Sequence, residues 1–378
     1  MTSLSRPDFS RSLLALANRI LTDLGCDSEH EPLSIAWPDT DIIVLWIVDG
    51  LGWNHVMTAL QNHDLPFCQT QITGNLSRSL TKLSTVFPST TVTALATLHF
   101  AKPPSEHGAL GYTLWDPEIL RTVNLLTSKD LTGSLCRSSI YQKRPTLYDR
   151  LRQHHVDSAV ISPEIFRHSA LSQWFYHGAQ YLGYHTPAEI PFLVQQAIIK
   201  ESRLVSVYWP GFDTISHVHG PTSPSAPLEL QLLDWIVSKT QEQIPSQAHV
   251  RFVMTADHGC IALTAPKHST DHLLSRLYAG ERRALYTAWS CEELKQELAA
   301  LEWEDALTLP NEQLWEEGWF GGLPKDSTFR LRTLQTTLLP PQDQQVAMRE
   351  PEAQILMGGH GGWSGKEREI FLAWWDVH

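Results

Sequence analysis

The chain has 378 residues, of which 42% are hydrophobic and 19% charged, and its formal net charge is −12. This composition suffices for one large core or two domains and excludes intrinsic disorder, which requires few apolar residues and many charges. The acidic balance argues against a nucleic-acid-binding surface, because neutralising phosphates requires clustered Lys and Arg.

Membrane and disulfide signals are missing from the sequence. The longest unbroken apolar run, Ile42–Val48, is far shorter than the roughly 18 residues typical of a spanning helix. The amino end shows no small-residue cleavage site of a secretory signal. The five cysteines are odd in number and scattered, without a CxxC pair. We therefore expect a cytoplasmic protein that is not bound to a membrane, and its oligomeric state stays open.

The first periodic segment lies near the amino end. Apolar residues at helical spacing from Leu13 to Leu24 predict a helix, with Pro7 near its start and Gly25 at its end.

Four apolar runs, each followed by a turn signal, predict buried strands. They are Ile42–Val48, Ala159–Ile161, Leu204–Trp209 and Val250–Met254. Runs without alternation are typical of a parallel sheet that is covered on both faces. Helical patterns lie between these runs, at Pro145–His155, Pro191–Glu201 and Leu228–Ile244. The alternation predicts an α/β fold, a three-layer αβα sandwich around a mostly parallel sheet.

Two stretches fit this alternation poorly. Residues Trp115–Ser139 mix Thr, Ser and Leu without a clean period. Residues 264–350 contain Trp, Glu and Pro-rich pieces around one predicted helix, Cys291–Leu301. Because no linker is long enough to force separate domains, we interpret residues 1–378 as one catalytic domain. Residues 264–350 are then an inserted cap or subdomain.

Carboxylates and imidazoles follow the predicted strands or lie in glycine-rich turns. They are Asp49, Asp213, His217, Asp257, His258 and His360. In a doubly wound sheet, function gathers where the strands end. Asp213 and His217 are four residues apart, so they share one face of a helical turn. Carboxylates combined with imidazoles are ligands of Zn²⁺ or Mn²⁺, and the pattern predicts a metal site.

Each of these residues alone has an ordinary structural explanation. An Asp after a strand often caps a helix or a turn, and a His in a glycine-rich loop is usually only a loop residue. The same relation to strand ends and glycine turns, repeated for the whole set, favours metal binding over coincidence.

A hydroxyl-rich segment from Phe87 to Leu95 contains Thr90 and Thr91. Hydroxyls at the start of a helix commonly serve only as caps. A Thr hydroxyl is a poor nucleophile unless a metal or a base removes its proton. Backbone donors and the positive end of the helix dipole also favour a bound phosphate there. Beside a metal site, the segment therefore predicts a nucleophile.

The order of these segments resembles that of the alkaline phosphatase superfamily, and most of all its type I phosphodiesterase/nucleotide pyrophosphatase branch. The matching segments are Asp49-Gly50, Pro88-Ser89-Thr90-Thr91, Pro103-Pro104-Ser105-Glu106-His107-Gly108, Tyr208 to Pro221 with Asp213 and His217, Thr255-Ala256-Asp257-His258-Gly259, and Gly359-His360-Gly361. The likeness spans roughly residues 40–262 and 355–366. It implies an alkaline-phosphatase-like sandwich with a dimetal site that hydrolyses small phosphorylated substrates.

The resemblance also implies a role for each matched residue. One metal ion would be bound by Asp49, Asp257 and His258, and the other by Asp213, His217 and His360. Both ions would be Zn²⁺, with Mn²⁺ as the alternative. Thr91 would be the metal-activated nucleophile and would also contact the first ion, with Thr90 as the fallback. Water would then hydrolyse the phosphothreonine.

The sequence differs from the pattern of this branch at positions expected to lie near the substrate. Where the branch carries an Asn that holds a phosphate oxygen, this chain has Tyr112, and Phe212 and Ser216 replace the usual Pro and Gly. We assign Tyr112 and Thr90 to substrate binding. A phosphomonoesterase, phosphonate hydrolase or phosphotransferase on the same scaffold stays an alternative. An alternative of another class is a non-catalytic, metal-stabilised interaction module.

Overall fold

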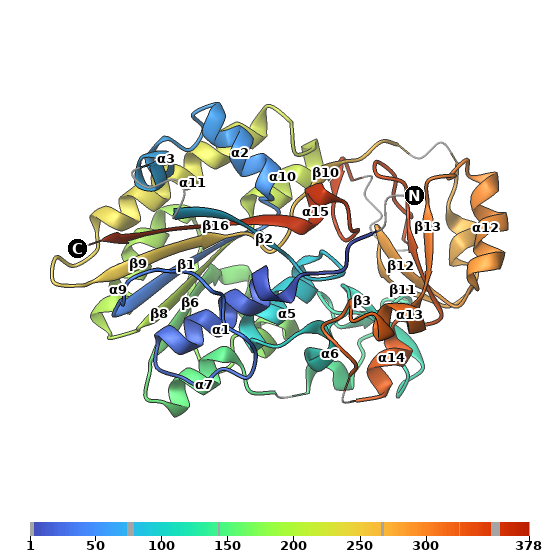
Figure 1. Cartoon of the computed structure of the whole chain (residues 1–378), viewed down its shortest axis with the longest axis horizontal. Helices are drawn as coiled ribbons and strands as arrows, with labels where there is room; N and C mark the ends of the chain where they lie inside the picture. The colour runs from blue at the N-terminus through green and yellow to red at the C-terminus, as the bar shows by residue number, and fades with distance from the viewer. Residues whose placement is uncertain are drawn as a thin grey trace.

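Two β-sheets organise the chain, and both combine segments that are far apart in sequence (Figure 1). The computed structural model describes residues 4–73, 79–142, 144–265, 268–324, 326–348 and 356–377. Among these residues, each sheet has seven strands, in the orders β2-β16-β9-β1-β8-β6-β7 and β13-β14-β12-β11-β3-β4-β5. A separate two-stranded ladder pairs β10 (Ile261–Ala262) with β15 (Gly358–Gly359).

The first sheet is mostly parallel. Its strands are β1 (Ile42–Val48), β2 (Leu80–Ser84), β6 (Ser158–Pro163), β7 (Gln180–Tyr184), β8 (Leu204–Trp209), β9 (Val250–Thr255) and β16 (Glu369–Val377). The central strands β1, β8 and β9 are buried almost throughout and pair in parallel. Strand β16 is antiparallel to both of its neighbours, β9 and β2. All four predicted strands are present, and the predicted sheet type is confirmed.

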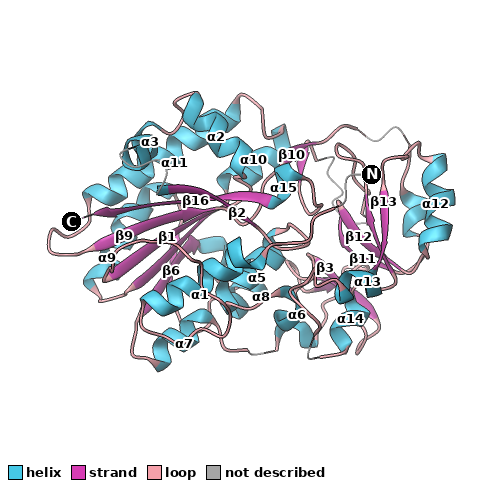
Figure 2. Ribbon diagram, in the orientation of Figure 1, coloured by secondary structure: helices cyan, strands magenta, loops and turns pink. Residues whose placement is uncertain are grey.

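Helices cover both faces of this sheet (Figure 2). One layer contains α2 (Trp53–Gln61), α3 (Pro66–Thr73), α9 (Ile190–Ile199), α10 (Gly211–His219) and α11 (Ser225–Glu242). The other layer contains α1 (Leu13–Asp23), α5 (Thr91–Phe100), α7 (Leu147–Gln153) and α8 (Ala170–Phe175). The predicted three-layer αβα sandwich is therefore confirmed. None of the helices that the structure describes has the length and hydropathy of a membrane span.

The amino-terminal helix is where the apolar spacing predicted it, but its cap differs. Ser12 is the N-cap, and its hydroxyl accepts a hydrogen bond from the backbone N–H of Leu14. Pro7 lies before this cap and outside α1. Gly25 follows the helix with a φ of 82°, in the left-handed region that favours glycine.

The second sheet is built from the two stretches that showed no clear period. Its strands are β3 (Thr113–Asp116), β4 (Arg121–Asn124), β5 (Lys129–Asp130), β11 (Tyr278–Glu281), β12 (Ala284–Thr287), β13 (Leu307–Pro310) and β14 (Thr336–Leu339). Gly280 pairs with Thr113 and joins the two stretches. Its outer helix α12 (Cys291–Ala300) is the one predicted within residues 264–350. The assignment of residues 264–350 as an insertion within a single domain stays a prediction. Residues 113–130 contribute strands β3, β4 and β5 to the same sheet.

Both faces of the second sheet are packed. The main hydrophobic core contains Val44 of the first sheet together with Leu114 and Tyr286 of the second. A smaller core lies between the second sheet and α12 and includes Leu294 and Leu338. Further short helices in the described residues are α6 (Pro104–His107), α13 (Asn311–Glu316), α14 (Thr328–Arg332) and α15 (Gly365–Arg368). The continuous core fixes the second sheet against the first.

Candidate metal centre

The six predicted ligands meet at the carboxyl edge of the first sheet. They are Asp49 after β1, Asp213 and His217 on α10 after β8, Asp257 and His258 after β9, and His360 after β15. Strand β1 lies between β8 and β9, so the ends of these strands are neighbours. The ligand atoms form two groups, each within 4.8 Å: Asp49, Asp257 and His258, and Asp213, His217 and His360. We call them the first and the second ligand group.

The first ligand group contains an uncompensated carboxylate oxygen. Backbone N–H groups of Gly50 and His258 donate to Asp257 Oδ1, at 3.0 and 2.8 Å. Asp257 Oδ2 is buried and has no hydrogen-bond partner in the described part of the chain. His258 Nε2 lies 3.3 Å from this oxygen and 3.4 Å from Asp49 Oδ1. A buried carboxylate oxygen without a donor is costly, and a cation would compensate it.

Two of the imidazoles are oriented as metal ligands usually are. His258 Nδ1 lies 3.1 Å from the carbonyl oxygen of Gly259, and His217 Nδ1 lies 2.9 Å from that of Gly358. A carbonyl can only accept, so each Nδ1 donates and each Nε2 faces the carboxylates. Imidazoles that bind metals typically donate their second N–H in this way.

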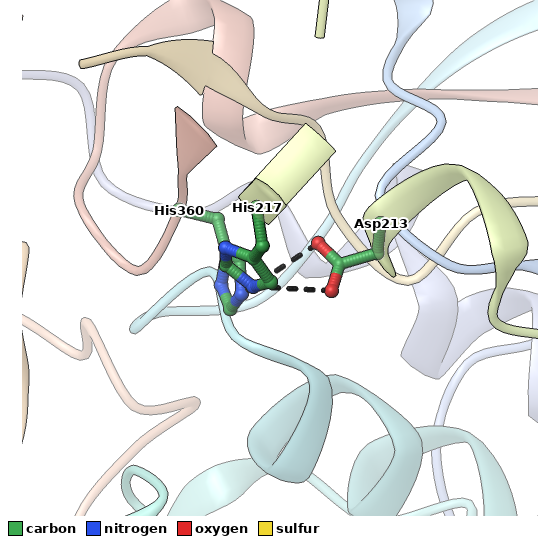
Figure 3. Close-up of side chains that lie close together, drawn as sticks. All are labelled: Asp213, His217 and His360. Atoms are coloured by element: carbon green, nitrogen blue, oxygen red, sulfur yellow. Dashed lines mark ion pairs between the residues drawn. The ribbon is translucent and has the colours of Figure 1, made fainter. Parts of the chain in front are cut away.

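The second ligand group centres on Asp213 (Figure 3). His217 Nε2 lies 3.1 Å from Asp213 Oδ2, and His360 Nε2 lies 3.9 Å from Asp213 Oδ1. The His360 ring also stacks on His258, with ring centroids 3.8 Å apart, so it adjoins both groups. Asp213 also lies close to the backbone of Gly50. The φ of Gly50 is 75°, and a Cβ there would lie only 3.0 Å from Asp213 Cβ, so glycine permits this close contact.

The site concentrates negative charge out of water. Burial, followed by the charges of Asp257 and Asp213, raises the pKa of Asp49 well above its usual value. The Tyr208 hydroxyl donates a hydrogen bond to Asp49 Oδ2. Burial also raises the pKa of Asp213, but the charge and hydrogen bond of His217 outweigh it and hold that pKa below its usual value. Positive charge between these carboxylates would relieve their repulsion.

Thr91 directs its hydroxyl at the first ligand group. It is the first residue of α5, and its Oγ1 lies 3.0 Å from His258 Nε2 and 3.5 Å from Asp49 Oδ1. Thr90 is the N-cap residue of α5, but its side chain makes no capping hydrogen bond. A role in capping alone would not require these contacts of Thr91.

A pocket of about 570 Å³ lies between the two sheets and is lined by Asp49 of the first ligand group and by all three residues of the second. On the side of the first sheet it is lined by Asp49, Thr90, Thr91, Tyr208, Asp213, His217 and His360. On the side of the second sheet it is lined by Tyr112, Asn124, Leu126, Thr127, Glu281, Arg282 and Arg283. Tyr112, predicted to bind substrate, is thus placed in the pocket wall, and its backbone N–H donates to Glu281 Oε1 at 2.6 Å.

Residues that the sequence analysis did not predict also lie at the site, and Cys260 and Asn124 are among them. Cys260 lies within 4.8 Å of ligand atoms of Asp213 and His258. Its signal was its place directly after the Asp257-His258-Gly259 turn. Asn124 lines the pocket but belongs to no motif, so no local signal could have found it.

Solved structures with this fold are known. The murine ectonucleotide pyrophosphatase/phosphodiesterase 5, an inactive threonine-to-alanine variant in complex with AMP, has a TM-score of 0.64 and 15% identity, covering 88% of this chain and 87% of that chain. The human protein of the same name has a TM-score of 0.58, 15% identity and the same coverage. Phosphonoacetate hydrolase from Sinorhizobium meliloti, in complex with phosphonoformate, has a TM-score of 0.62 and 16% identity, covering 89% of this chain and 91% of that chain.

The family follows from the sequence match. Among curated proteins no relative matches the chain. The family model described as type I phosphodiesterase / nucleotide pyrophosphatase matches residues 43–289. The chain therefore belongs to this family, which confirms the predicted family, the fold and the class of metal-dependent phosphate-ester hydrolases.

Proposed function

We propose that the chain is a phosphodiesterase in which Thr91 attacks phosphorus and two divalent metal ions are bound by the two ligand groups. The observation that carries this proposal is the position of Thr91 Oγ1, 3.0 Å from His258 Nε2 and 3.5 Å from Asp49 Oδ1. A hydroxyl at the edge of a ligand group is where a nucleophile of this chemistry is needed.

The residues present fit metal ions. Asp257 Oδ2 is buried without a hydrogen-bond partner among the described residues, and His217 and His258 present Nε2 to the carboxylates. Three imidazoles with three carboxylates favour Zn²⁺, with Mn²⁺ as the alternative. Bound divalent ions would supply Lewis acidity and outweigh the three carboxylate charges, which makes the site attractive to phosphate.

The reaction proceeds in two displacements. Thr91 Oγ1 gives its proton to solvent and forms a bond to phosphorus, while the bond from phosphorus to the leaving-group oxygen breaks and that oxygen takes up a proton from solvent. Water then hydrolyses the phosphothreonine and restores the hydroxyl. The start of the ten-residue helix α5 presents backbone N–H groups and the positive end of its dipole to the phosphate charge.

Two of the similar structures bear on the choice of substrate. The inactive murine variant replaces a threonine and holds AMP, which supports a threonine nucleophile and a nucleotide ester. The Sinorhizobium meliloti enzyme is a phosphonoacetate hydrolase, which supports a phosphonate as the second candidate substrate.

Release of p-nitrophenol tests the proposal. After treatment with a chelator and reloading with Zn²⁺ or Mn²⁺, we expect faster turnover of bis-p-nitrophenyl phosphate than of p-nitrophenyl phosphate. Faster turnover of the monoester would identify a phosphomonoesterase, and phosphate release from phosphonoacetate a phosphonate hydrolase. Bound metals with no turnover of any of these compounds would favour the non-catalytic module.

We also propose that the protein acts in the cytoplasm. All five cysteines are free in the structure, and Cys26, Cys68 and Cys260 are buried. Free buried thiols suit a reducing compartment. Fractionation of the source cells tests this location, and recovery of the protein in an extracellular or periplasmic fraction would contradict it.

A further inference from the structure

Asn124 ends strand β4 with its side chain held in a fixed orientation. Its Oδ1 accepts hydrogen bonds from the backbone N–H groups of Leu126 and Thr127, at 2.9 and 3.2 Å. A backbone N–H can only donate, so the atom that faces these two groups is the oxygen. The amide nitrogen Nδ2 therefore points away from these two backbone groups.

The Nδ2 group is an uncommitted donor at the pocket. It makes no hydrogen bond to the described residues, whereas Asn124 is half-buried and lines the pocket together with Thr91. Two other side-chain donors of the same wall are engaged. Arg283 pairs with Glu367 at 3.1 Å, and Gln345 Nε2 donates to the carbonyl oxygen of Leu356 at 3.4 Å.

We infer that Asn124 Nδ2 donates a hydrogen bond to an oxygen of the bound phosphate ester. A phosphate ester that contacts Thr91 lies in the pocket that Asn124 also lines, and its non-bridging oxygens can only accept hydrogen bonds. Hydrogen bonds from a neutral amide to an anionic oxygen are stronger than those between neutral groups. The inference rests on the proposed function and makes Asn124 a substrate-binding residue of the second sheet.

The sheet holds this donor in place before substrate arrives. Asn124 pairs with Thr113 of β3 on one side and with Lys129 of β5 on the other. The turn that engages Oδ1 removes the side-chain freedom that binding would otherwise have to restrict. A donor that is fixed in advance loses little entropy when it contacts the phosphate.

A purely structural role for Asn124 can be separated from this one by an isosteric change. Asn124→Asp keeps an oxygen that accepts from Leu126 and Thr127, since Asp forms the same turn. It replaces the Nδ2 donor with an anionic oxygen, which repels phosphate. Asn124→Ala removes both the turn and the donor.

Titration calorimetry of the metal-loaded protein with inorganic phosphate tests the inference, with thermal unfolding and turnover of bis-p-nitrophenyl phosphate measured in parallel. We expect Asn124→Asp to weaken phosphate binding roughly 10- to 100-fold with little change in the unfolding midpoint. Asn124→Ala should weaken binding and also lower the midpoint. Asp130→Asn is the control, because Asp130 Oδ1 accepts from Thr132 and Ser134 in the next turn, away from the pocket lining.

The outcomes distinguish this inference from the proposed function. If Asn124→Asp binds phosphate and turns over the diester as the wild type does, Asn124 is only a turn residue and the inference is wrong. If the metal-loaded wild type neither binds phosphate nor hydrolyses any ester, the proposed function fails, and the inference fails with it.

Discussion

Cys260 Sγ lies 3.4 Å from Asp213 Oδ1, so a buried thiol contacts the carboxylate at the centre of the second ligand group. Burial and the charge of Asp213 raise the pKa of Cys260 well above its usual value. As the donor of this hydrogen bond, the Cys260 thiol helps to orient Asp213.

The first prediction concerns this contact. Cys260→Ala removes the donor, and we expect the affinity of the second ligand group for metal to fall roughly 10- to 100-fold, as it does when partners that orient metal ligands are lost. Competition with a chelator measures this affinity. Cys291→Ala, on α12, is the control and should change nothing. Unchanged affinity of both ions in Cys260→Ala would show that the thiol only fills space.

The second prediction concerns His360, which reaches the second ligand group from the loop after β15. His360→Ala should lower the metal content from about two ions per chain toward one, because Asp213 and His217 alone bind too weakly. Metal analysis of the purified variant measures this content. His219→Ala, an exposed residue at the end of α10, should retain both ions. Two tightly bound ions in His360→Ala would remove His360 from the ligand set.

The third prediction concerns the residue that holds the His360 loop. Glu367 is buried, accepts from the backbone N–H of Gly362 at 2.9 Å and pairs with Arg283 at 3.1 Å. Glu367→Gln leaves Arg283 buried without a counter-charge, and should lower the free energy of unfolding by about 3–5 kcal/mol. Denaturant unfolding measures this loss. The control Glu369→Gln breaks only a surface pair with Lys82 and should cost about 0–1 kcal/mol.

The pH dependence of the same pair follows from its pKa. Burial raises the pKa of Glu367, but the charge of Arg283 and its hydrogen bond outweigh burial and lower it overall. A lowered pKa stabilises the fold fully above the unfolded value of about 4.3, and this stabilisation is lost as pH falls through the folded value below it. The stability difference between wild type and Glu367→Gln should therefore be largest near neutral pH and shrink in acid. A difference that grows in acid would contradict the assignment.

The strands of the first sheet show what could be predicted from sequence. Strand β1 is apolar along its whole length and β8 is apolar except for Ser206, because both of their faces are covered, so their bounds could be predicted. Strand β16 was missed, since it is antiparallel and its pairing with β9 and β2 depends on residues far away in the sequence. It also accounts for Trp374, whose ring lies 5.1 Å from the guanidinium of the fully buried Arg251.

Some residues of the site could likewise be predicted from local sequence, whereas others could not. Asp49 directly follows the continuous apolar run of β1, and Asp257 lies two residues after the end of the buried strand β9, so their positions could be predicted from local sequence. Asn124 reaches the pocket only because β3 pairs with β11, where Thr113 and Gly280 are 167 positions apart. No local pattern encodes a pairing of that range, and the second sheet was therefore missed.

The central claim is that Thr91 is the nucleophile. Thr91→Ala should lower turnover by about three orders of magnitude or more, because nucleophile and metals act as one unit. The metal content should change little, since Asp49, Asp257 and His258 remain. Thr91→Ser keeps the hydroxyl and should retain partial activity. Thr90→Ala changes a residue assigned to substrate binding, so it should raise KM but retain turnover at saturating substrate.

Turnover of bis-p-nitrophenyl phosphate by Thr91→Ala and Thr90→Ala, with the metal content of each variant determined in the same sample, tests this claim most directly. The account predicts an inactive Thr91→Ala that carries both ions, beside an active Thr90→Ala. An active Thr91→Ala beside an inactive Thr90→Ala would move the nucleophile by one residue. Two active variants with both ions bound would contradict covalent attack and favour direct attack by water.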